Sequence, residues 1–345
     1  MIIDTKELFF ERINQLYQRK VPFFFLTDYA CRQMEVTPLS ELSTSAVNFQ
    51  LPGYIHEASP GTCSESETIN SSIPENKSRL STHRSLEWEK SPISYDTYLT
   101  AYNKVQRELQ LGNSYLVNLT CSTPVKTNFT LKELYQLGAG KYKLWYRDQF
   151  VHFSPEPFIR IDAVTISSFP MKGTIDAMQA GAVDQLIQSD KETAEQFTIV
   201  DLIRNDLNQV ALQVEVEDFR YVEKLHTNQK DLYTVSSKIT GRLRPRFLDR
   251  PGDILAAMLP AGSVTGAPKA ATCQIIADSE THQRNYYTGV WGCYNGLSLD
   301  SCVIIRYLEK SKEGFTFKSG GGITSMSDPK TEYQEMIDKV YVPLY

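Results

Sequence analysis

Closely spaced strand patterns, joined by stretches too short for a crossover, constrain the fold of this chain more than any other feature. Residues 287–297 and 301–309 are both rich in β-branched and aromatic residues, and only three residues separate them. A crossover between parallel strands needs about a dozen residues or more. The spacing therefore favours antiparallel pairing over a doubly wound parallel sheet. Further strands are predicted near residues 22–28, 114–122, 143–153, 158–169, 211–224 and 314–319.

Helical patterns alternate with these strands. Apolar residues recur at helical spacing in segments that predict helices near residues 1–20, 94–111, 130–138, 190–211, 251–259, 267–280 and 329–341. Residues 57–85 instead carry many Ser, Thr, Asn, Glu and Pro residues and few large apolar ones, which predicts a mobile surface loop. We therefore divide the chain into a short variable N-terminal segment, 1–93, and a main body, 94–345, within one fold.

Charge and hydrophobic run length exclude two classes of function. The chain has 345 residues, and 36 Lys and Arg residues against 41 Asp and Glu residues leave a formal charge of −5. Such a chain lacks the basic surface that binds phosphate backbones, so we expect no nucleic-acid partner. The longest aromatic and aliphatic run, residues 21–26, is far shorter than the roughly 20 residues of a spanning helix, so we expect no membrane insertion. Acidic residues near the start disfavour a signal peptide.

Cysteine spacing and missing fingerprints narrow the chemistry further. The six cysteines form no CxxC pair, so we expect small buried side chains in a reducing, cytoplasmic compartment rather than a zinc site or a disulfide framework. The sequence has no GxGxxG after a strand, no GxxxxGK[ST] and no GxSxG. A dinucleotide fold, a P-loop and a nucleophile elbow are therefore disfavoured.

The helix predicted at 190–211 carries two acidic residues on its inner side. On a helical wheel, Glu192 and Glu195 lie opposite the polar stripe that contains Asp201 and Asn205, and beside core-type residues. Buried carboxylates need a cation or a proton, which makes this pair a candidate binding site. The alternative is that both are surface acids and that Ser189 and Glu192 form a capping box.

A second helix, predicted at 329–341, repeats the Glu-x-x-Glu spacing. Glu332, Glu335 and Lys339 share a stripe beside the apolar face, and Asp328 suits the N-cap. A solvated Glu–Lys pair is the alternative explanation of this stripe. If the two acidic helices converge, their carboxylate oxygens form a site suited to Mg²⁺.

A glycine run, a small-residue loop and one lysine complete the candidate residues. Gly320, Gly321 and Gly322 follow a strand pattern, and their N–H groups can approach an anion closely. The loop 260–270 feeds a helix and offers further N–H groups to a carboxylate. A flexible turn and a helix cap are the alternatives.

Lys172 follows an apolar strand between Pro-Met and Gly-Thr, where desolvation would favour its neutral, nucleophilic form, although a lysine at a strand end is usually just solvated.

Taken together, these segments resemble the chorismate-utilising enzyme family, which includes anthranilate, isochorismate, salicylate and aminodeoxychorismate synthases. The similarity covers roughly residues 150–345, is weaker over 94–122 and is hardly visible over 1–93. The strings that carry it occur in family order: SPEPF (154–158), PMKGT (170–174), DKETAEQFTIVDLIRNDL (190–207), GSVTGAPK (262–269), YYTGVWG (286–292), IIR (304–306) and GGGITSMSDPKTEYQEMIDK (320–339).

The resemblance implies a single large α/β domain of the α+β type, in which two antiparallel sheets pack together with helices outside. The active site lies between the sheets, and residues 94–345 form the chorismate-binding catalytic domain. The implied Mg²⁺ ion is held chiefly by Glu195 and Glu335, with Glu192 and Glu332 acting through water, and it binds the ring carboxylate of chorismate. The implied substrate-binding residues are Gly173, Thr174, Thr265, Arg306, Gly320, Gly321, Gly322 and Lys339.

The resemblance also implies specific roles for two residues. Arg306 holds the enolpyruvyl carboxylate of the substrate. Glu156 resembles the general acid that protonates the departing 4-hydroxyl group. That role needs a raised pKa, which neighbouring carboxylates would supply.

Lys172 indicates one branch of the family. The anthranilate and isochorismate branches typically carry alanine at this position, whereas aminodeoxychorismate synthases typically carry lysine. There the amine attacks ring carbon 2 as the 4-hydroxyl leaves, and ammonia then adds at carbon 4 and expels the lysine. Leu116 and Thr234 replace residues that other branches use to activate water and to eliminate pyruvate. Cys293 replaces a tyrosine that contacts substrate, and Tyr294 is the alternative candidate for that contact.

The resulting prediction is a Mg²⁺-dependent enzyme that makes 4-amino-4-deoxychorismate, the precursor of 4-aminobenzoate and folate. No cysteine nucleophile with a downstream His-x-Glu is visible, so ammonia is expected from a separate glutamine amidotransferase subunit. An anthranilate- or isochorismate-type enzyme is the first alternative, and a non-catalytic binding subunit of the same fold is the second. A binding subunit would need neither Lys172 nor the glutamates.

Overall fold

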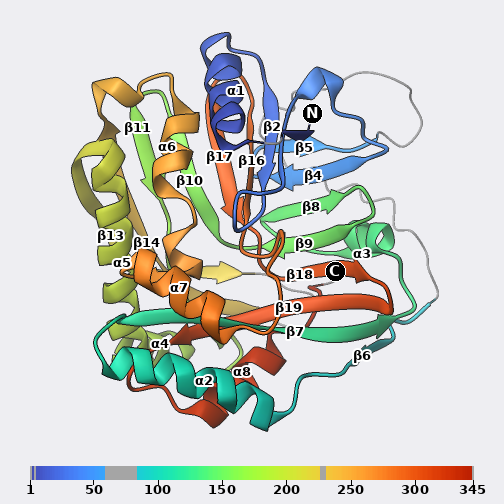
Figure 1. Ribbon diagram of the computed structural model, residues 1–345, viewed down its shortest axis with the longest axis vertical. Helices are drawn as coiled ribbons and strands as arrows, with labels where there is room; N and C mark the ends of the chain where they lie inside the picture. Colours follow the sequence, from blue (N-terminus) through green and yellow to red (C-terminus); the bar gives the residue numbers. More distant parts are fainter. Residues whose placement is uncertain (1, 4, 59–83, 226–230, 344–345) are drawn as a thin grey trace.

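The computed structural model describes residues 2–3, 5–58, 84–225 and 231–343, and two large sheets dominate it (Figure 1). Within these residues the first sheet has ten strands in the order β1-β3-β2-β16-β17-β10-β11-β14-β12, with β13 paired to β14. The strands are β1 (Ile2–Ile3), β2 (Phe23–Thr27), β3 (Met34–Pro38), β10 (Pro157–Asp162), β11 (Thr165–Ser168), β12 (Met171–Asp176), β13 (Ala211–Leu225), β14 (Leu232–Leu243), β16 (Val290–Tyr294) and β17 (Ser298–Val303).

The second sheet has nine strands in the described residues, in the order β15-β7-β19-β18-β9-β8-β4-β5, with β6 paired to β7. They are β4 (Val47–Leu51), β5 (Tyr54–His56), β6 (Trp88–Lys90), β7 (Leu116–Thr127), β8 (Tyr142–Tyr146), β9 (Phe150–Ser154), β15 (Gly266–Ala267), β18 (Tyr307–Ser311) and β19 (Gly314–Ile323). Neighbouring strands of both sheets pair antiparallel, as the short connections predicted.

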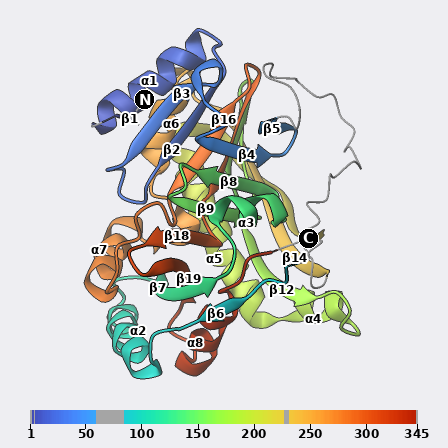
Figure 2. The same cartoon turned by 90° about the vertical axis from the view of Figure 1, so that its right-hand side faces the viewer.

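Helices cover the outer faces of both sheets (Figures 1 and 2). Helices α1, α5 and α6 pack along the first sheet, α4 lies against β12, α3 lies on β8 and β9, and α2, α7 and α8 cover β7 and β19. Their bounds are α1 (Lys6–Gln18), α2 (Tyr95–Gln110), α3 (Leu131–Leu137), α4 (Ala182–Gln188), α5 (Asp190–Val210), α6 (Pro251–Met258), α7 (Lys269–Ser279) and α8 (Pro329–Asp338). Short 3₁₀ turns occupy Leu39–Glu41, Pro245–Phe247 and Gly262–Val264.

Strand β2 shows why the sheets stack. Its side chains alternate between two cores, because successive strand residues point to opposite faces. Phe23 and Phe25 pack in the core under α1, α5 and α6, whereas Phe24 and Leu26 pack with Trp291 in the aromatic core between the sheets. A strand that is apolar on both faces must be covered on both faces, so the helices end up outside and the second sheet inside.

The run predicted as one strand at 301–309 is two strands in different sheets. Strand β17 ends at Val303 in the first sheet, and β18 starts at Tyr307 in the second. The chain crosses between the sheets over residues 304–306, and Arg306 takes a positive φ of 52° there. Hydrophobic content alone does not reveal this break, because the run is apolar on both sides of it. The runs at 143–153 and 158–169 are likewise hairpins, β8–β9 and β10–β11, rather than single strands.

The N-terminal residues contribute to both sheets. Strand β2 pairs with β16 in the first sheet, and β4 pairs with β8 in the second. The loop predicted at 57–85 falls almost entirely on residues 59–83, which lie outside the described residues. No helix in the described part of the chain has the length and apolar character to cross a bilayer. Four of the five described cysteines are buried free thiols, as predicted for small core residues, and Cys273 is half-buried.

Candidate active site

Lys172 and the glycines of β19 come from different sheets and meet between them. Lys172 lies on β12 of the first sheet, and Gly322 lies on β19 of the second. A Cβ atom placed on Gly322 would lie 3.6 Å from the Nζ atom of Lys172 and 3.0 Å from Cδ1 of Leu116. The amine of Lys172 therefore reaches the second sheet where glycine leaves room, beside an apolar side chain.

The glycine run lies inside a strand rather than after one, which corrects the predicted loop. Gly320 and Gly322 pair with Thr120 and Asn118 of β7, whose own N–H groups donate to other acceptors. Backbone hydrogen bonds therefore do not join Gly320 to Thr120 or Gly322 to Asn118. In an antiparallel pair of this kind the N–H groups point away from the partner strand, so those of Gly320 and Gly322 point to the edge of β19 that faces away from β7. The register with β18 ends at Lys318. Beyond that residue no described strand pairs with this edge of β19.

Two side chains of α8 and that of Lys339, which follows the helix, surround Gly321. A Cβ atom on Gly321 would lie 3.5 Å from Oε2 of Glu332, 3.7 Å from Oε1 of Glu335 and 3.7 Å from Nζ of Lys339. Lys339 pairs with Glu335 at 2.6 Å and donates to the carbonyl of Gly320 at 2.9 Å. The Glu–Lys pair of the alternative explanation thus exists, but it is built against the glycine strand. Burial lowers the pKa of Lys339, and the Glu335 carboxylate opposes this shift.

Gly173 brings α5 against β12. Its φ is +72°, which strains any residue that has a side chain, and a Cβ atom there would lie 2.7 Å from Oε2 of Glu192, which would have to shift. Ser189 accepts the N–H of Glu192 at 3.3 Å, which confirms the serine half of the predicted cap. Thr234 donates its hydroxyl to the Gly173 carbonyl at 2.9 Å. Thr174 pairs with Thr234 across the strands, and its side chain lies outside what the structure describes.

The acidic residues have the donor chemistry of a Mg²⁺ site. Glu332 and Glu335 flank Gly321, Glu192 flanks Gly173, and Glu195 is half-buried one turn further along α5. Among the residues that the structure describes, no three Asp, Glu, His or Cys side chains stand close enough together to hold a metal ion. The oxygen donors fit the ion in kind, although the described side chains do not form a three-ligand cluster.

Glu156 connects the site electrostatically. It is half-buried just before β10. Burial raises the pKa of its carboxyl group, while the Ser263 hydroxyl and the charges of Lys172, Arg306 and Lys339 oppose the rise. The direction agrees with the role of an acid, but the predicted cause is wrong: the groups that surround Glu156 are cations, and burial raises the pKa. The charges of three predicted cations, Lys172, Arg306 and Lys339, thus act on this one carboxyl group.

Arg306 stands at the crossing between the sheets. Its carbonyl accepts the N–H of Phe153 at 3.3 Å, which ties the crossing to the end of β9. Its guanidinium carbon lies 5.3 Å from the ring centroid of Tyr341. Arg306 is thus held between β9 and the segment after α8, with its charge near Glu156 and Lys339.

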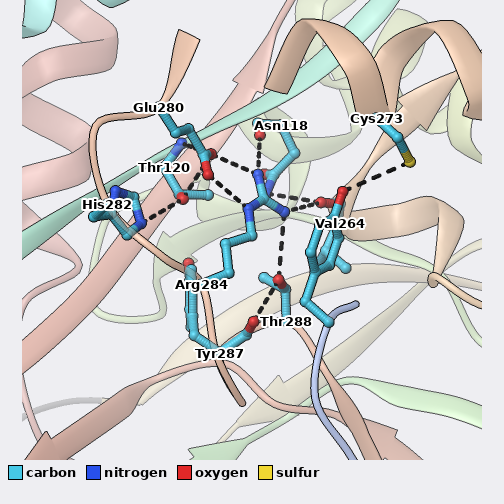
Figure 3. A network of polar contacts seen from close by, with 10 residues as sticks. Asn118, Thr120, Val264, Cys273, Glu280, His282, Arg284, Tyr287 and Thr288 are labelled. Atoms are coloured by element: carbon cyan, nitrogen blue, oxygen red, sulfur yellow. Dashed lines mark hydrogen bonds and ion pairs between the residues drawn. The ribbon is translucent and has the colours of Figure 1, made fainter. Parts of the chain in front are cut away.

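The buried ion pair between Glu280 and Arg284 holds the segment before α7 against β7 (Figure 3). Arg284 pairs with Glu280 at 2.6 Å, and both side chains are almost fully buried. The same guanidinium donates to the carbonyl of Val264 at 2.8 Å and to the carbonyl of Asn118 at 2.7 Å. Glu280 also accepts the N–H of Thr120 at 2.9 Å. One ion pair thereby fixes two backbone segments that border the glycine strand.

The predicted loop 260–270 contributes differently from expectation. The hydroxyl of Thr265 donates to the Ala261 carbonyl at 2.9 Å and is buried, and Lys269 pairs with Asp206 at 2.8 Å, so both hold the loop in place. The loop residue at the site is Ser263, through Glu156. Our sequence reasoning missed Ser263 and the Glu280–Arg284 pair. An i,i+4 pair of opposite charge is the only signal for the latter, and it is common on solvated helices.

The proposed substitute for Cys293 does not reach this region. Cys293 is buried in the core between the sheets, and Tyr294 points to the other face of β16. The Tyr294 ring packs 4.4 Å from Tyr17, and its hydroxyl donates to the Gly296 carbonyl at 2.9 Å. Tyr294 is therefore a core residue under α1.

The sequence matches one protein family over nearly its whole length. The family model for chorismate binding enzymes covers residues 11–345. The chain belongs to the chorismate-binding enzyme family. The match starts at residue 11, so it includes most of the segment 1–93. The N-terminal strands that complete both sheets explain why the family similarity extends so far.

Relatives of this chorismate-binding enzyme have different names. It is 44% identical to an uncharacterized PabA-like protein of Pasteurella multocida, over 97% of this chain and 98% of that protein. It is 31% identical to aminodeoxychorismate synthase component 1 of Escherichia coli, over 74% of this chain and 58% of that protein. It is 32% identical to anthranilate synthase component 1 of Spirochaeta aurantia, over 72% and 54%. Identity alone does not separate these two activities.

Solved structures confirm the predicted fold. The menaquinone-specific isochorismate synthase of Escherichia coli superimposes with a TM-score of 0.71 at 18% identity, over 98% of this chain and 82% of that chain. Anthranilate synthase component I of Streptococcus pneumoniae superimposes with a TM-score of 0.63 at 25% identity, over 74% and 58%. Two packed antiparallel sheets with helices outside are the shared architecture.

Proposed function

We propose that this chorismate-binding enzyme aminates chorismate with ammonia to 4-amino-4-deoxychorismate. The observation that carries the proposal is the position of Lys172, whose amine lies at Gly322 beside Leu116. Leucine has no group that takes a proton from water, which disfavours isochorismate formation at this place. The similarity to aminodeoxychorismate synthase component 1 of Escherichia coli supports the same assignment.

In the proposed reaction Lys172 is the nucleophile and Glu156 the acid. The neutral amine of Lys172 forms a bond to ring carbon 2, the ring double bonds shift, and the bond between carbon 4 and its hydroxyl breaks. Glu156 protonates the departing hydroxyl, which leaves as water, and takes back the proton that the new secondary amine loses. Ammonia then adds at carbon 4, the shift reverses as Glu156 returns a proton to the departing Lys172 nitrogen, and the new ammonium group gives one proton back to Glu156, which releases the neutral Lys172 amine. The sum is chorismate plus ammonia giving aminodeoxychorismate plus water.

Chorismate has two carboxylates, and the site offers cations and N–H groups to both. Arg306 is proposed to hold the enolpyruvyl carboxylate through its planar fork of donors. Gly173 and Thr174 are proposed to border the ring, and Thr265 is proposed to act through its loop. The N–H groups of Gly320 and Gly322, the backbone of Gly321 and the charge of Lys339 are proposed to complete the substrate site.

Mg²⁺ is proposed as the cofactor. Glu195 and Glu335 would hold the ion, with Glu192 and Glu332 acting through water. When bound, the ion supplies positive charge that neutralises the ring carboxylate of chorismate. Lys339 balances the charge of Glu335, which it contacts at 2.6 Å.

Ammonia is proposed to come from a separate glutamine amidotransferase subunit. The sequence of this chain shows no cysteine nucleophile followed by His-x-Glu, so glutamine is not expected to serve directly. Ammonium salts would replace the partner in vitro, because they are in equilibrium with neutral ammonia, which is the form that attacks carbon 4.

Product identification tests this function. The protein is incubated with chorismate, Mg²⁺ and ammonium, and the product is identified by mass and chromatography against standards. We expect aminodeoxychorismate. Anthranilate would instead support the activity named for the Spirochaeta aurantia relative, and isochorismate would contradict the role given to Leu116. Unchanged chorismate, in a protein that binds it, would support the non-catalytic alternative.

A further inference from the structure

The segment after α8 places an aromatic ring on Arg306. Val340 and Val342 are 1% and 5% exposed and pack in the cluster that contains Leu134 and Trp145. Tyr341, between them, leaves this cluster and lies with its ring centroid 5.3 Å from the guanidinium carbon of Arg306. The two buried valines therefore determine where the tyrosine ring stands.

Backbone contacts fix this segment on both sides of the ring. The indole N–H of Trp88 donates to the carbonyl of Val340 at 3.3 Å. The N–H of Ala139 donates to the carbonyl of Pro343 at 2.6 Å. Because β6 and the loop after α3 hold these carbonyls, the ring of Tyr341 is a fixed surface beside the long side chain of Arg306.

A ring over the guanidinium has a definite effect on its chemistry. The aromatic face attracts the cation through the ring quadrupole, without taking up any of its N–H donors in a hydrogen bond to an acceptor atom. The five N–H donors lie in the plane of the guanidinium, so they stay available to a carboxylate. A long side chain that would otherwise sample many rotamers is thereby held in one orientation, and less freedom is lost when substrate binds.

We infer that Tyr341 is a positioning residue that orients Arg306 for a carboxylate of the substrate. The inference rests on the proposed role of Arg306 in binding chorismate. It assigns the effect to the aromatic ring and not to the hydroxyl. Removing the ring should weaken substrate binding without changing the chemical step, whereas removing only the hydroxyl should change little.

The test compares Tyr341→Leu, Tyr341→Phe and a matched control, Tyr95→Leu. Tyr95 is also half-buried and has an aromatic neighbour, Tyr333, at 5.3 Å, but it lies on α2 away from Arg306. Chorismate binding is measured by calorimetry, KM and kcat by product formation, and folding by thermal denaturation. We expect Tyr341→Leu to raise both Kd and KM about tenfold with kcat within about twofold of wild type. Tyr341→Phe and Tyr95→Leu should match the wild type in Kd.

A double variant assigns the effect to Arg306. In an Arg306→Lys background, Tyr341→Leu should raise Kd by less than about twofold more. An unchanged Kd in Tyr341→Leu, an equal loss in Tyr341→Phe, or a full tenfold loss in the Arg306→Lys background would each overturn the inference. A wild type that binds chorismate but forms no aminodeoxychorismate would contradict the proposed function alone, because the Kd values still report on Tyr341.

Discussion

Two lysines of the site have different surroundings, which suit them to different tasks. Lys339 contacts a carboxylate and a backbone carbonyl, at 2.6 Å and 2.9 Å, so its amine is tied to Glu335 and to Gly320. Lys172 lies by a glycine backbone and the Leu116 side chain. The nucleophilic role is therefore proposed for Lys172 and the electrostatic role for Lys339.

A covalent adduct on Lys172 is the direct consequence. Incubation with chorismate and Mg²⁺ but no ammonia should raise the intact-protein mass by chorismate less one water, and peptide mapping should place the addition on Lys172. Lys172→Ala should lose the adduct and most amination, and Lys172→Arg should fail too, because guanidinium stays protonated. Lys330→Ala removes an exposed lysine of α8 and should behave as wild type. Amination by Lys172→Ala at the wild-type rate would mean that ammonia attacks directly.

Two glycines with similar backbone angles separate strain from steric contact. Gly173 has φ +72° and faces the Glu192 carboxylate, whereas Gly181 has φ +68° and nothing within 4 Å of its Cβ position. Gly181→Ala should cost about 1 kcal/mol of unfolding free energy for the left-handed backbone and leave kcat/KM unchanged. Gly173→Ala should lose more stability and more than about tenfold in kcat/KM, since Glu192 must move. Urea denaturation and product assays measure both. Equal activity of the two variants would remove Glu192 from the site.

Residue types were easier to predict than residue contacts. The string around Lys172 and the Glu-x-x-Glu spacing of α8 marked residues that the structure places around the glycines of β19, whereas Glu192 of α5 lies at Gly173 on β12. The surroundings of Glu156 were predicted wrongly, because its cationic neighbours come from β12, from the sheet crossing and from the end of α8. A sequence lists side chains in order and does not state which of them share a cavity wall. Ser263 was missed for the same reason.

At the scale of elements, helical periodicity served well. The wheel of α5 placed Glu192 and Glu195 beside the core stripe, and Ile199, Leu202 and Ile203 are buried there. Asp328 accepts the N–H of Thr331 at 2.8 Å as the N-cap of α8, as predicted. Periodicity reports the side of a helix, so it predicts exposure along one element. It does not predict which strand the acidic side faces.

The acidic helices predict how metal binding should respond to substitution. Glu195→Gln and Glu335→Gln should each weaken Mg²⁺ binding by more than about a hundredfold, because each removes a charged oxygen donor. Glu332→Gln should weaken it by about tenfold to a hundredfold, as expected for a ligand that acts through water. Glu313→Gln, in the exposed turn between β18 and β19, is the control. Calorimetry with Mg²⁺ alone measures the effect. Full turnover in excess chelator would contradict the metal assignment.

At the scale of the whole molecule, nearby strands were predictable and distant pairings were not. The pairing of β16 with β17 follows from three intervening residues. The pairing of β2 with β16, and of β7 with β19, joins segments far apart in the sequence. Hydrophobic runs state that a strand is buried and do not name its partner. The site depends on those distant pairings, since they bring β12 and β19 face to face.

The core between the sheets also contains a histidine that should make the fold sensitive to acid. His152 is fully buried, and its Nε2 atom accepts the indole N–H of Trp291 at 2.5 Å. Burial lowers its pKa to about 3. The pKa of histidine in the unfolded chain is near 6.5. Below that pH the unfolded chain binds a proton at His152 that the native protein does not bind, so the free energy of unfolding decreases as pH falls.

This residue should therefore reduce the free energy of unfolding by about 1.4 kcal/mol per pH unit between about pH 6 and pH 4. His152→Gln supplies an uncharged acceptor to Trp291 and removes that proton uptake, so its stability should fall less steeply with acid. Urea denaturation at pH 7, 6, 5 and 4 measures both slopes, and the difference isolates His152 from the carboxylates that titrate in the same range. If the free energy of unfolding fell equally steeply with pH in both proteins, His152 would be protonated in the folded state, and the prediction would be wrong.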